Sequence, residues 1–488
     1  MANSALIPRL KTPGVYIEEI SQFPPSVAQV PTAIPVFIGY TQKAKNERDE
    51  DLTMKPVRIS SMLEYRNLFG GPDPEKGITV EVTADPLKDG SKKYTIKRAS
   101  NPSPSKFKMF YSLQWFFING GGDCWIVSVG NYAATLSDTT LLSGLEETDK
   151  VDEITLILFP DAQGLTSNYY GLYNEALGTC ARLGDRFTIM DIQPSEEGLT
   201  ADVETMRNNI TSEISTAKYG AAYCPNINTN LDYYFYDKMV DDGNGDANVT
   251  LVLTPDTDPL EGKTLADIKP VVPPIDTTNS ALYAQVKAAI RDMPLELPPS
   301  SAIAGIYARV DSTRGVWKAP ANVGLDFVVE PTVNITDKTQ ENLNIDVTSG
   351  KSVNAIRSFT GKGKGIVWGA RTLAGNDNEW RYISVRRFFN MVEESVKKAT
   401  VQFVFEPNDK NTWVRVKGMI DNFLTLQWRA GALQGAVPEH AFYVKVGLGE
   451  TMTALDILEG RLIVEIGMAV VRPAEFIILQ FMHKLPES

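Results

Sequence analysis

The last third of the chain, residues 352–483, constrains the fold most, because two helical patterns are followed there by three β-rich runs. Apolar residues recur at helical spacing between Val385 and Val396 and predict an amphipathic helix. The charged residues between them are assigned to its solvated face: Arg386, Arg387, Glu393, Glu394, Lys397 and Lys398.

A second helix is predicted directly after the first. Its apolar stripe runs from Trp413 to Trp428. Asp409 or Asn411 can cap its amino end, and Gly431 stands where a helix usually stops. β-branched and aromatic residues then predict strands at 441–446, 461–471 and 474–482. This region is therefore expected to be an α+β domain, with two helices against a small sheet.

Before this region, strand and helix patterns alternate. Apolar runs such as CWIVSV (124–129) predict buried strands. The alternation of strands and helices over 141–224 indicates parallel strands, and 34–325 is expected to be an α/β core domain. Two segments rich in proline, glycine and charge, 72–106 and 226–279, are expected to be inserts on its surface, and the helical pattern after the second is assigned to the core. The other parts are a crossing segment, the C-terminal domain and two terminal arms: 326–351, 352–473, 1–33 and 474–488.

Five short stretches carry a resemblance to a known family: VWGARTL (367–373), FEPND (405–409), GALQGAVPEHAFYVKVG (431–447), PAEFI (473–477) and TPGVYIEE (12–19). They resemble the sheath proteins of contractile tails, which occur in phages, R-type bacteriocins and extracellular contractile injection systems. Because the matching pieces occur together across most of a 488-residue chain, they are specific as a set, although each is short. The resemblance implies a multidomain α/β sheath protomer with an α+β C-terminal domain, inserted surface subdomains and strand-donating arms.

Both termini contain strand patterns without a local partner. The segment 15–18 alternates as a strand does, and the prolines on both sides of it exclude a tight hairpin. The apolar run 474–482 lies at the other end, where an unpaired sheet edge would invite aggregation. Ordinary edge strands within one chain are one explanation. The resemblance implies instead that the arms add strands to the sheets of neighbouring subunits. The residues assigned to this exchange are Val15, Tyr16, Ile17, Glu18, Phe476, Ile477, Ile478 and Leu479.

Charge is distributed unevenly along the chain. Residues 351–417 contain 13 Lys and Arg against 6 Asp and Glu, whereas the whole chain contains 48 against 60. Such an excess can contact nucleic acid, an acidic protein surface or only solvent, and no nucleic-acid motif favours the first. The resemblance places the C-terminal domain against an inner tube. The candidates for that contact are Lys362, Lys364, Arg386, Arg387, Lys397 and Lys398.

Phosphate-binding loops are incomplete in this sequence. The tripeptides 350–352 and 262–264 end as such a loop does, but Ile345 and Thr257 stand where the loop needs its first glycine. Without that glycine the backbone cannot direct several N–H groups at a phosphate. The glycine-rich segment GKGKG (361–365) is interpreted as a basic turn between strands.

Hydrolytic and metal sites are not indicated either. His440 and His483 are the only histidines, and no GxSxG motif is present. The acidic run 241–246 lacks the closing glutamate of a calcium loop, and the three cysteines form no CxxC pair. No run of 18 apolar residues and no signal-peptide pattern occur, which predicts folding in the cytoplasm without membrane insertion. We therefore predict no catalytic, cofactor-binding or metal-binding residue.

The chain is thus predicted to be the structural sheath subunit of a contractile phage tail or a phage-tail-like injection system. The resemblance implies a homo-oligomer of stacked rings around an inner tube protein, with baseplate and tail-terminator or cap proteins as further partners and no direct contact with nucleic acid. Contraction would drive the tube through a target envelope, from a virion tail or a released particle. The alternatives are a non-contractile structural virion component and a catalytic α/β protein.

Overall fold

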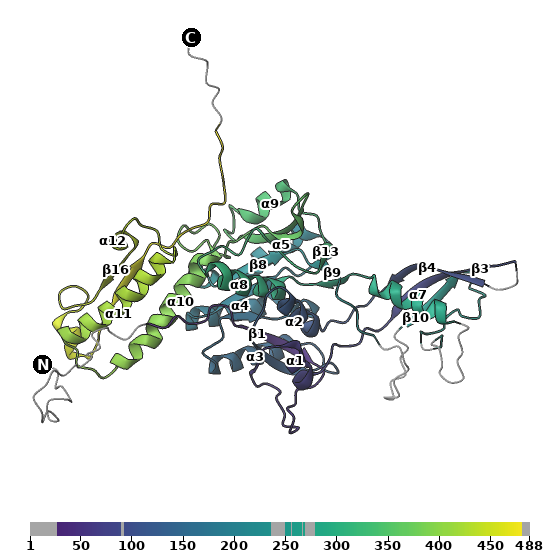
Figure 1. Ribbon diagram of the computed structural model, residues 1–488, viewed down its shortest axis with the longest axis horizontal. Helices are drawn as coiled ribbons and strands as arrows, with labels where there is room; N and C mark the ends of the chain where they lie inside the picture. Colours follow the sequence, from purple (N-terminus) through teal and green to yellow (C-terminus); the bar gives the residue numbers. More distant parts are fainter. Residues whose placement is uncertain are drawn as a thin grey trace, which may run out of the picture. The chain divides into compact units, whose positions relative to one another are not determined.

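The computed structural model describes residues 27–88, 92–235, 249–254, 256–265, 267–268 and 279–480 (Figure 1). The chain divides into two compact units. The larger unit comprises Pro31–Met391 with Arg472–Ser488, and the smaller comprises Met1–Val30 with Val392–Val471. The boundary between the two units therefore lies near residue 391 and not at residue 352, where it was expected.

A nine-stranded sheet forms the centre of the larger unit, in the order β12-β15-β14-β8-β7-β6-β1-β5-β2. Its strands are β12 (Val323–Gly324), β15 (Gly363–Val367), β14 (Val353–Phe359), β8 (Gly220–Cys224), β7 (Phe187–Asp191), β6 (Leu156–Leu158), β1 (Pro35–Thr41), β5 (Cys124–Asn131) and β2 (Val57–Ile59). The six from β14 to β5 run parallel to their neighbours, and the other three pair antiparallel. Since β14 pairs with β8, residues 353–367 complete this sheet and belong to the larger unit.

Helices cover both faces of the parallel strands. Every residue of β1 is buried, as expected of a strand with two covered faces. Val36 and Ile38 pack with α3 (Asp138–Glu147), α4 (Tyr169–Leu183) and α5 (Leu199–Asn209). Phe37, on the opposite face, packs with α1 (Met62–Phe69), α2 (Met109–Ile118) and α8 (Ser300–Arg314). The predicted α/β fold is confirmed.

The two predicted inserts contribute to a single small sheet. Strand β3 (Ile78–Pro86) pairs antiparallel with β4 (Lys92–Ser100) and parallel with β10 (Val249–Thr254). Helix α7 (Ser280–Arg291) buries Leu282, Val286 and Ile290 in the same apolar cluster as Ile78 and Val80. The assignment of this helix to the α/β core is therefore wrong, because its apolar stripe covers the sheet that the inserts build.

A third sheet, in the order β11-β9-β13, changes the other expected boundaries. Its strands are β9 (Ile227–Thr229), β11 (Leu295–Leu297) and β13 (Val328–Pro331). Both neighbours pair antiparallel with β9, so the second insert begins after this strand and not at residue 226. The expected crossing segment supplies β13 and α9 (Asp337–Asn344) to the larger unit.

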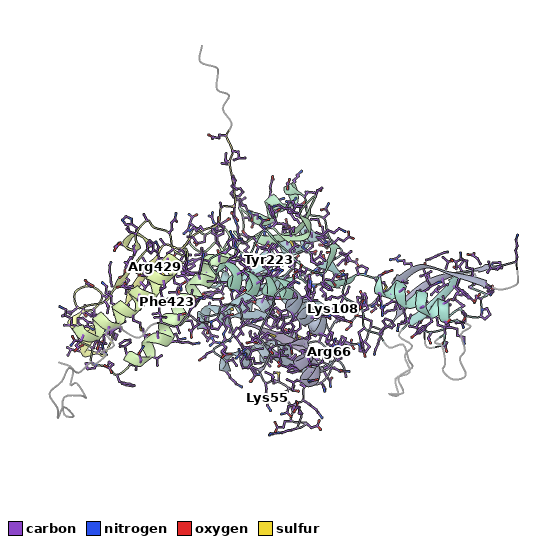
Figure 2. All side chains as sticks on the ribbon, viewed as in Figure 1. Lys55, Arg66, Lys108, Tyr223, Phe423 and Arg429 are labelled. Atoms are coloured by element: carbon purple, nitrogen blue, oxygen red, sulfur yellow. The ribbon has the colours of Figure 1, made fainter. Side chains whose placement is uncertain are left out.

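The smaller unit contains the carboxyl half of one long helix, a second long helix and a two-stranded sheet, where two helices and three strands were predicted. Helix α10 (Ile383–Thr400) ends in this unit, and α11 (Lys410–Arg429) follows it. Asp409 caps α11 by accepting the N–H of Thr412 at 2.9 Å. After α12 (Pro438–Ala441), β16 (Phe442–Lys445) pairs antiparallel with β17 (Glu465–Met468), and α13 (Ala454–Leu458) lies between them in sequence. Figure 2 shows Phe423, a buried residue of α11, among these side chains.

Candidate assembly surfaces

The C-terminal segment exposes an apolar run. Residues 472–480 form no helix or strand (Figure 1). The exposed fractions are 68% for Phe476, 78% for Ile477, 82% for Ile478 and 72% for Leu479. Single exposed apolar residues are common, but four in succession are unusual on the surface of a monomer. The predicted strand at 474–482 is absent from residues 474–480.

The small sheet of β16 and β17 offers edges to which such a segment can pair. Phe442 lies opposite Met468 and Lys445 lies opposite Glu465. Within the described residues no third strand joins this sheet, although Leu433 and Val470 form an isolated bridge beside it. A two-stranded sheet has unpaired backbone groups on both edges and gains stability when a strand is added. The predicted amino-terminal exchange residues, Val15 to Glu18, lie outside the described residues.

The predicted basic patch is only partly exposed. Arg387 is 3% exposed, and its Nη2 donates to Asp311 Oδ2 at 2.5 Å and to the Thr32 carbonyl at 2.8 Å. Arg386 is 1% exposed, donates to Asn390 Oδ1 at 2.7 Å and stacks on the Trp380 ring. The prediction that both arginines lie on a solvated helix face is wrong. This part of α10 is enclosed by the larger unit, whose carboxylate, amide and aromatic groups satisfy the guanidinium ions.

Four lysines of the predicted patch remain accessible. Lys362 lies in the turn between β14 and β15, and Lys364 is the second residue of β15; both are exposed, and Gly361, Gly363 and Gly365 all have positive φ. Lys397 and Lys398 are 69% and 43% exposed at the side chain, and their Nζ atoms lie 3.1 and 3.3 Å from Glu394 carboxylate oxygens. Only Gly361 and Lys362 of the segment GKGKG lie in the turn, because β15 begins at Gly363, so the interpretation of 361–365 as a turn between strands holds only in part.

Groups typical of metal or nucleophile chemistry are sparse among the described residues. No three His, Cys, Asp or Glu residues are grouped to hold a metal ion among the described residues. His440 is exposed, while all three cysteines are buried, and burial raises the pKa of Cys224 to about 12. A surface cleft lined by residues that include Asp73, Ser105 and Thr166 has no histidine or cysteine in its lining. No helix among the described residues is long and apolar enough to cross a membrane.

Comparisons with known proteins converge on one family. The model of the phage tail sheath C-terminal domain matches residues 375–483. The tail sheath protein of Burkholderia phage BcepMu is 30% identical over 132 residues, which are 26% of this chain and 26% of the relative. The matched stretches span about a quarter of the length of the curated relatives.

Solved structures match nearly the whole chain. The anti-feeding prophage (AFP) helical sheath in the contracted state is 31% identical, with a TM-score of 0.63 over 97% of this chain and 100% of that one. The PVC sheath complex of an extracellular contractile injection system, also contracted, is 29% identical, with a TM-score of 0.63 over 97% and 98% of the two chains. The chain belongs to the contractile tail sheath family.

This sheath protein also has an exposed apolar corner that was not predicted from the sequence. Between α10 and α11, the exposed fractions are 64% for Val401, 60% for Val404 and 103% for Phe405. Phe405 has a φ of 70°, a conformation that non-glycine residues rarely adopt. The apolar run before Pro407 could have indicated this corner, because its residues follow the helical stripe without continuing its spacing.

Proposed function

We propose that this sheath protein polymerises as stacked rings around an inner tube and contracts to drive that tube through a target envelope. The observation that carries the proposal is the match of 97% of the chain to a helical sheath in the contracted state at 31% identity. Extended sheaths store free energy behind a kinetic barrier, and contraction is the rearrangement that releases it. The partners are further copies of the chain, the tube protein, the baseplate and a terminator or cap, and assembly takes place in the bacterial cytoplasm.

The terminal arms are proposed to link neighbouring subunits by strand exchange. The exposed run Phe476–Leu479 supplies the donor segment at the carboxyl end, and Val15–Glu18 supplies the one at the amino end. The β16–β17 sheet of a neighbouring subunit has the free edges that can accept them. Pairing there would satisfy backbone groups and cover apolar side chains at once.

The contact with the inner tube is proposed to involve Lys362, Lys364, Lys397 and Lys398. Their exposure supports this proposal, whereas Arg386 and Arg387 are withdrawn from it because they are buried. A hydrated electrostatic contact is weaker and tolerates more movement than an apolar one. It would hold the tube in register and still release it during contraction.

Electron microscopy of the purified full-length protein tests the proposal. We expect tubes of helically arranged subunits, which become shorter and wider when mild denaturant lowers the barrier to contraction. Tubes of a single length that break without shortening would favour a non-contractile structural component. Only monomers or small oligomers at every concentration would contradict the sheath function. Deletion of residues 474–488 should leave a folded monomer that forms no tubes.

A further inference from the structure

We propose that Arg371 and Glu475 form an anchor that fixes the start of the C-terminal arm to the larger unit. The proposal rests on the proposed function and deepens it, since it names the residues that position the arm for strand exchange. Arg371 lies in the stretch VWGARTL and Glu475 lies in PAEFI, two of the stretches that carried the family resemblance. The proposed function by itself gives neither residue a role.

The two side chains meet in a bidentate ion pair. Arg371 Nε lies 2.9 Å from Glu475 Oε1, and Nη2 lies 2.5 Å from Oε2. Tyr382 Oη is 3.3 Å from the same Oε2. The Arg371 side chain is 3% exposed and that of Glu475 is 16% exposed. A bidentate pair with little solvent around it fixes both position and direction, which an exposed single contact cannot do.

Arg371 is itself held rigidly in the larger unit. Its backbone N–H donates to Asn354 Oδ1, and its carbonyl accepts from Asn354 Nδ2, both at 2.8 Å. Its Nη1 donates to the carbonyls of Asn344 and Gly375, each at 3.3 Å. The backbone of Arg371 and its Nη1 are therefore hydrogen-bonded to other parts of the larger unit. The remaining nitrogens, Nε and Nη2, are directed at Glu475.

The attachment of the chain ends at Glu475. From Val471 to Glu475, partly buried residues alternate with exposed ones, as they do in an extended segment with one side against a protein. Every residue from 476 to 480 is exposed. The exposed residue Arg472 provides a second attachment, through a 2.7 Å hydrogen bond from its Nη1 to the Asn378 carbonyl. Glu475 is therefore the last partly buried residue before the donor segment begins.

An anchor at this position would raise the chance that the arm meets its acceptor. A short segment attached close to its binding site has a high effective concentration there, and lengthening the free segment lowers it. Without the Glu475 contact the free segment would start near Pro473. Any pull between neighbouring subunits would then pass to the single, exposed hydrogen bond of Arg472.

The first test measures the arm in the monomer, below the concentration at which tubes form. Since the three native cysteines are buried, a dye can be attached selectively to Phe476→Cys, one residue beyond the anchor. We expect Glu475→Gln to lower the dye's fluorescence anisotropy clearly, because the amide loses the charge that holds the guanidinium. The matched control is Glu459→Gln, which removes a carboxylate paired with Arg461 at an exposed site and should leave the anisotropy unchanged. Equal anisotropy in Glu475→Gln and the unsubstituted chain would overturn the anchor.

The second test measures assembly, without the dye. Glu475→Gln should raise the protein concentration needed for tube formation, measured under conditions in which its unfolding curve shows the variant to be fully folded. Arg371→Lys keeps the positive charge but cannot form the bidentate pair, so the concentration that it needs for tube formation should lie between those of the unsubstituted protein and Glu475→Gln. It also covers the case in which Glu475→Gln fails to fold. If the unsubstituted protein forms no tubes, the proposed function fails. If both variants form tubes at its concentration, only the anchor fails.

Discussion

The buried pair of Arg387 and Asp311 gives the sharpest test of the corrected charge assignment. Arg387 was predicted to be on the helix surface, yet the two side chains are 3% and 7% exposed. Arg387→Met keeps the apolar volume of the side chain but leaves the Asp311 carboxylate buried without its counter-ion. Removing one partner of a buried pair costs about 3–5 kcal/mol. We therefore expect the free energy of unfolding of the larger unit to fall by that amount.

A matched control exists in the same unit. Arg182 and Asp149 are joined at the same distance, 2.5 Å, but their side chains are 57% and 35% exposed. Arg182→Met should cost no more than about 1 kcal/mol, because water replaces the lost partner. Because the two ion pairs have the same length, the difference in stability between the two variants reports the effect of burial and not of distance.

Urea unfolding, followed by tryptophan fluorescence, measures both variants. Adding Asp311→Leu to Arg387→Met should recover part of the loss, because no unpaired charge then remains buried. Equal destabilisation by Arg387→Met and Arg182→Met would refute the reasoning from burial. Unchanged stability in Arg387→Met, together with weaker binding to the tube, would restore Arg387 to the tube contact.

Three further predictions follow from other parts of the molecule. Burial raises the pKa of Asp191 to about 7. The contribution of its protonated carboxyl to stability is therefore complete below about pH 4 and is lost as the pH rises to 7. Asp191→Asn should flatten this pH dependence of the free energy of unfolding, which amounts to at most about 4 kcal/mol. Ile290→Ala should cost about 2–5 kcal/mol within the β10-β3-β4 sheet, seen as faster hydrogen exchange in β3 and β4 with β1 unchanged. Replacing Lys397 and Lys398 by Glu should weaken assembly on the tube, and unsubstituted assembly should weaken as salt rises to about 1 M.

The sequence predicted the elements whose signals are local. The apolar run 124–129 predicted a buried strand, and it forms β5 between β1 and β2. Asp409 was one of two candidates for the cap of the second helix, and it accepts the Thr412 N–H. In each case the neighbouring residues contain the physical cause, whether continuous hydrophobicity or an acceptor at the helix start.

The elements that were missed depend on partners far away in the sequence. Arg387 was assigned to solvent because its charge is visible in the sequence, while its partner Asp311 lies 76 residues earlier. Strands β3 and β10 were placed in separate inserts, although Val80 pairs with Leu251 in one sheet. Similarly, no local signal shows that Val353 pairs with Ala222 and joins the larger unit. Helical spacing gives the period of a pattern but not the surroundings of each face.

The attachments of the two arms suggest why contraction can leave a sheath connected. At the amino end, the Val30 N–H donates to Ser395 Oγ at 3.1 Å, and Gln427 Nε2 donates to Gln29 Oε1 at 3.2 Å, all within the smaller unit. At the carboxyl end, Glu475 is held by Arg371 within the larger unit. Gln29 and Val30 are therefore held by the smaller unit, and Glu475 is held by the larger unit. On the proposed function, each of these contacts lies inside one unit, so links made by strand exchange could persist while the subunits repack.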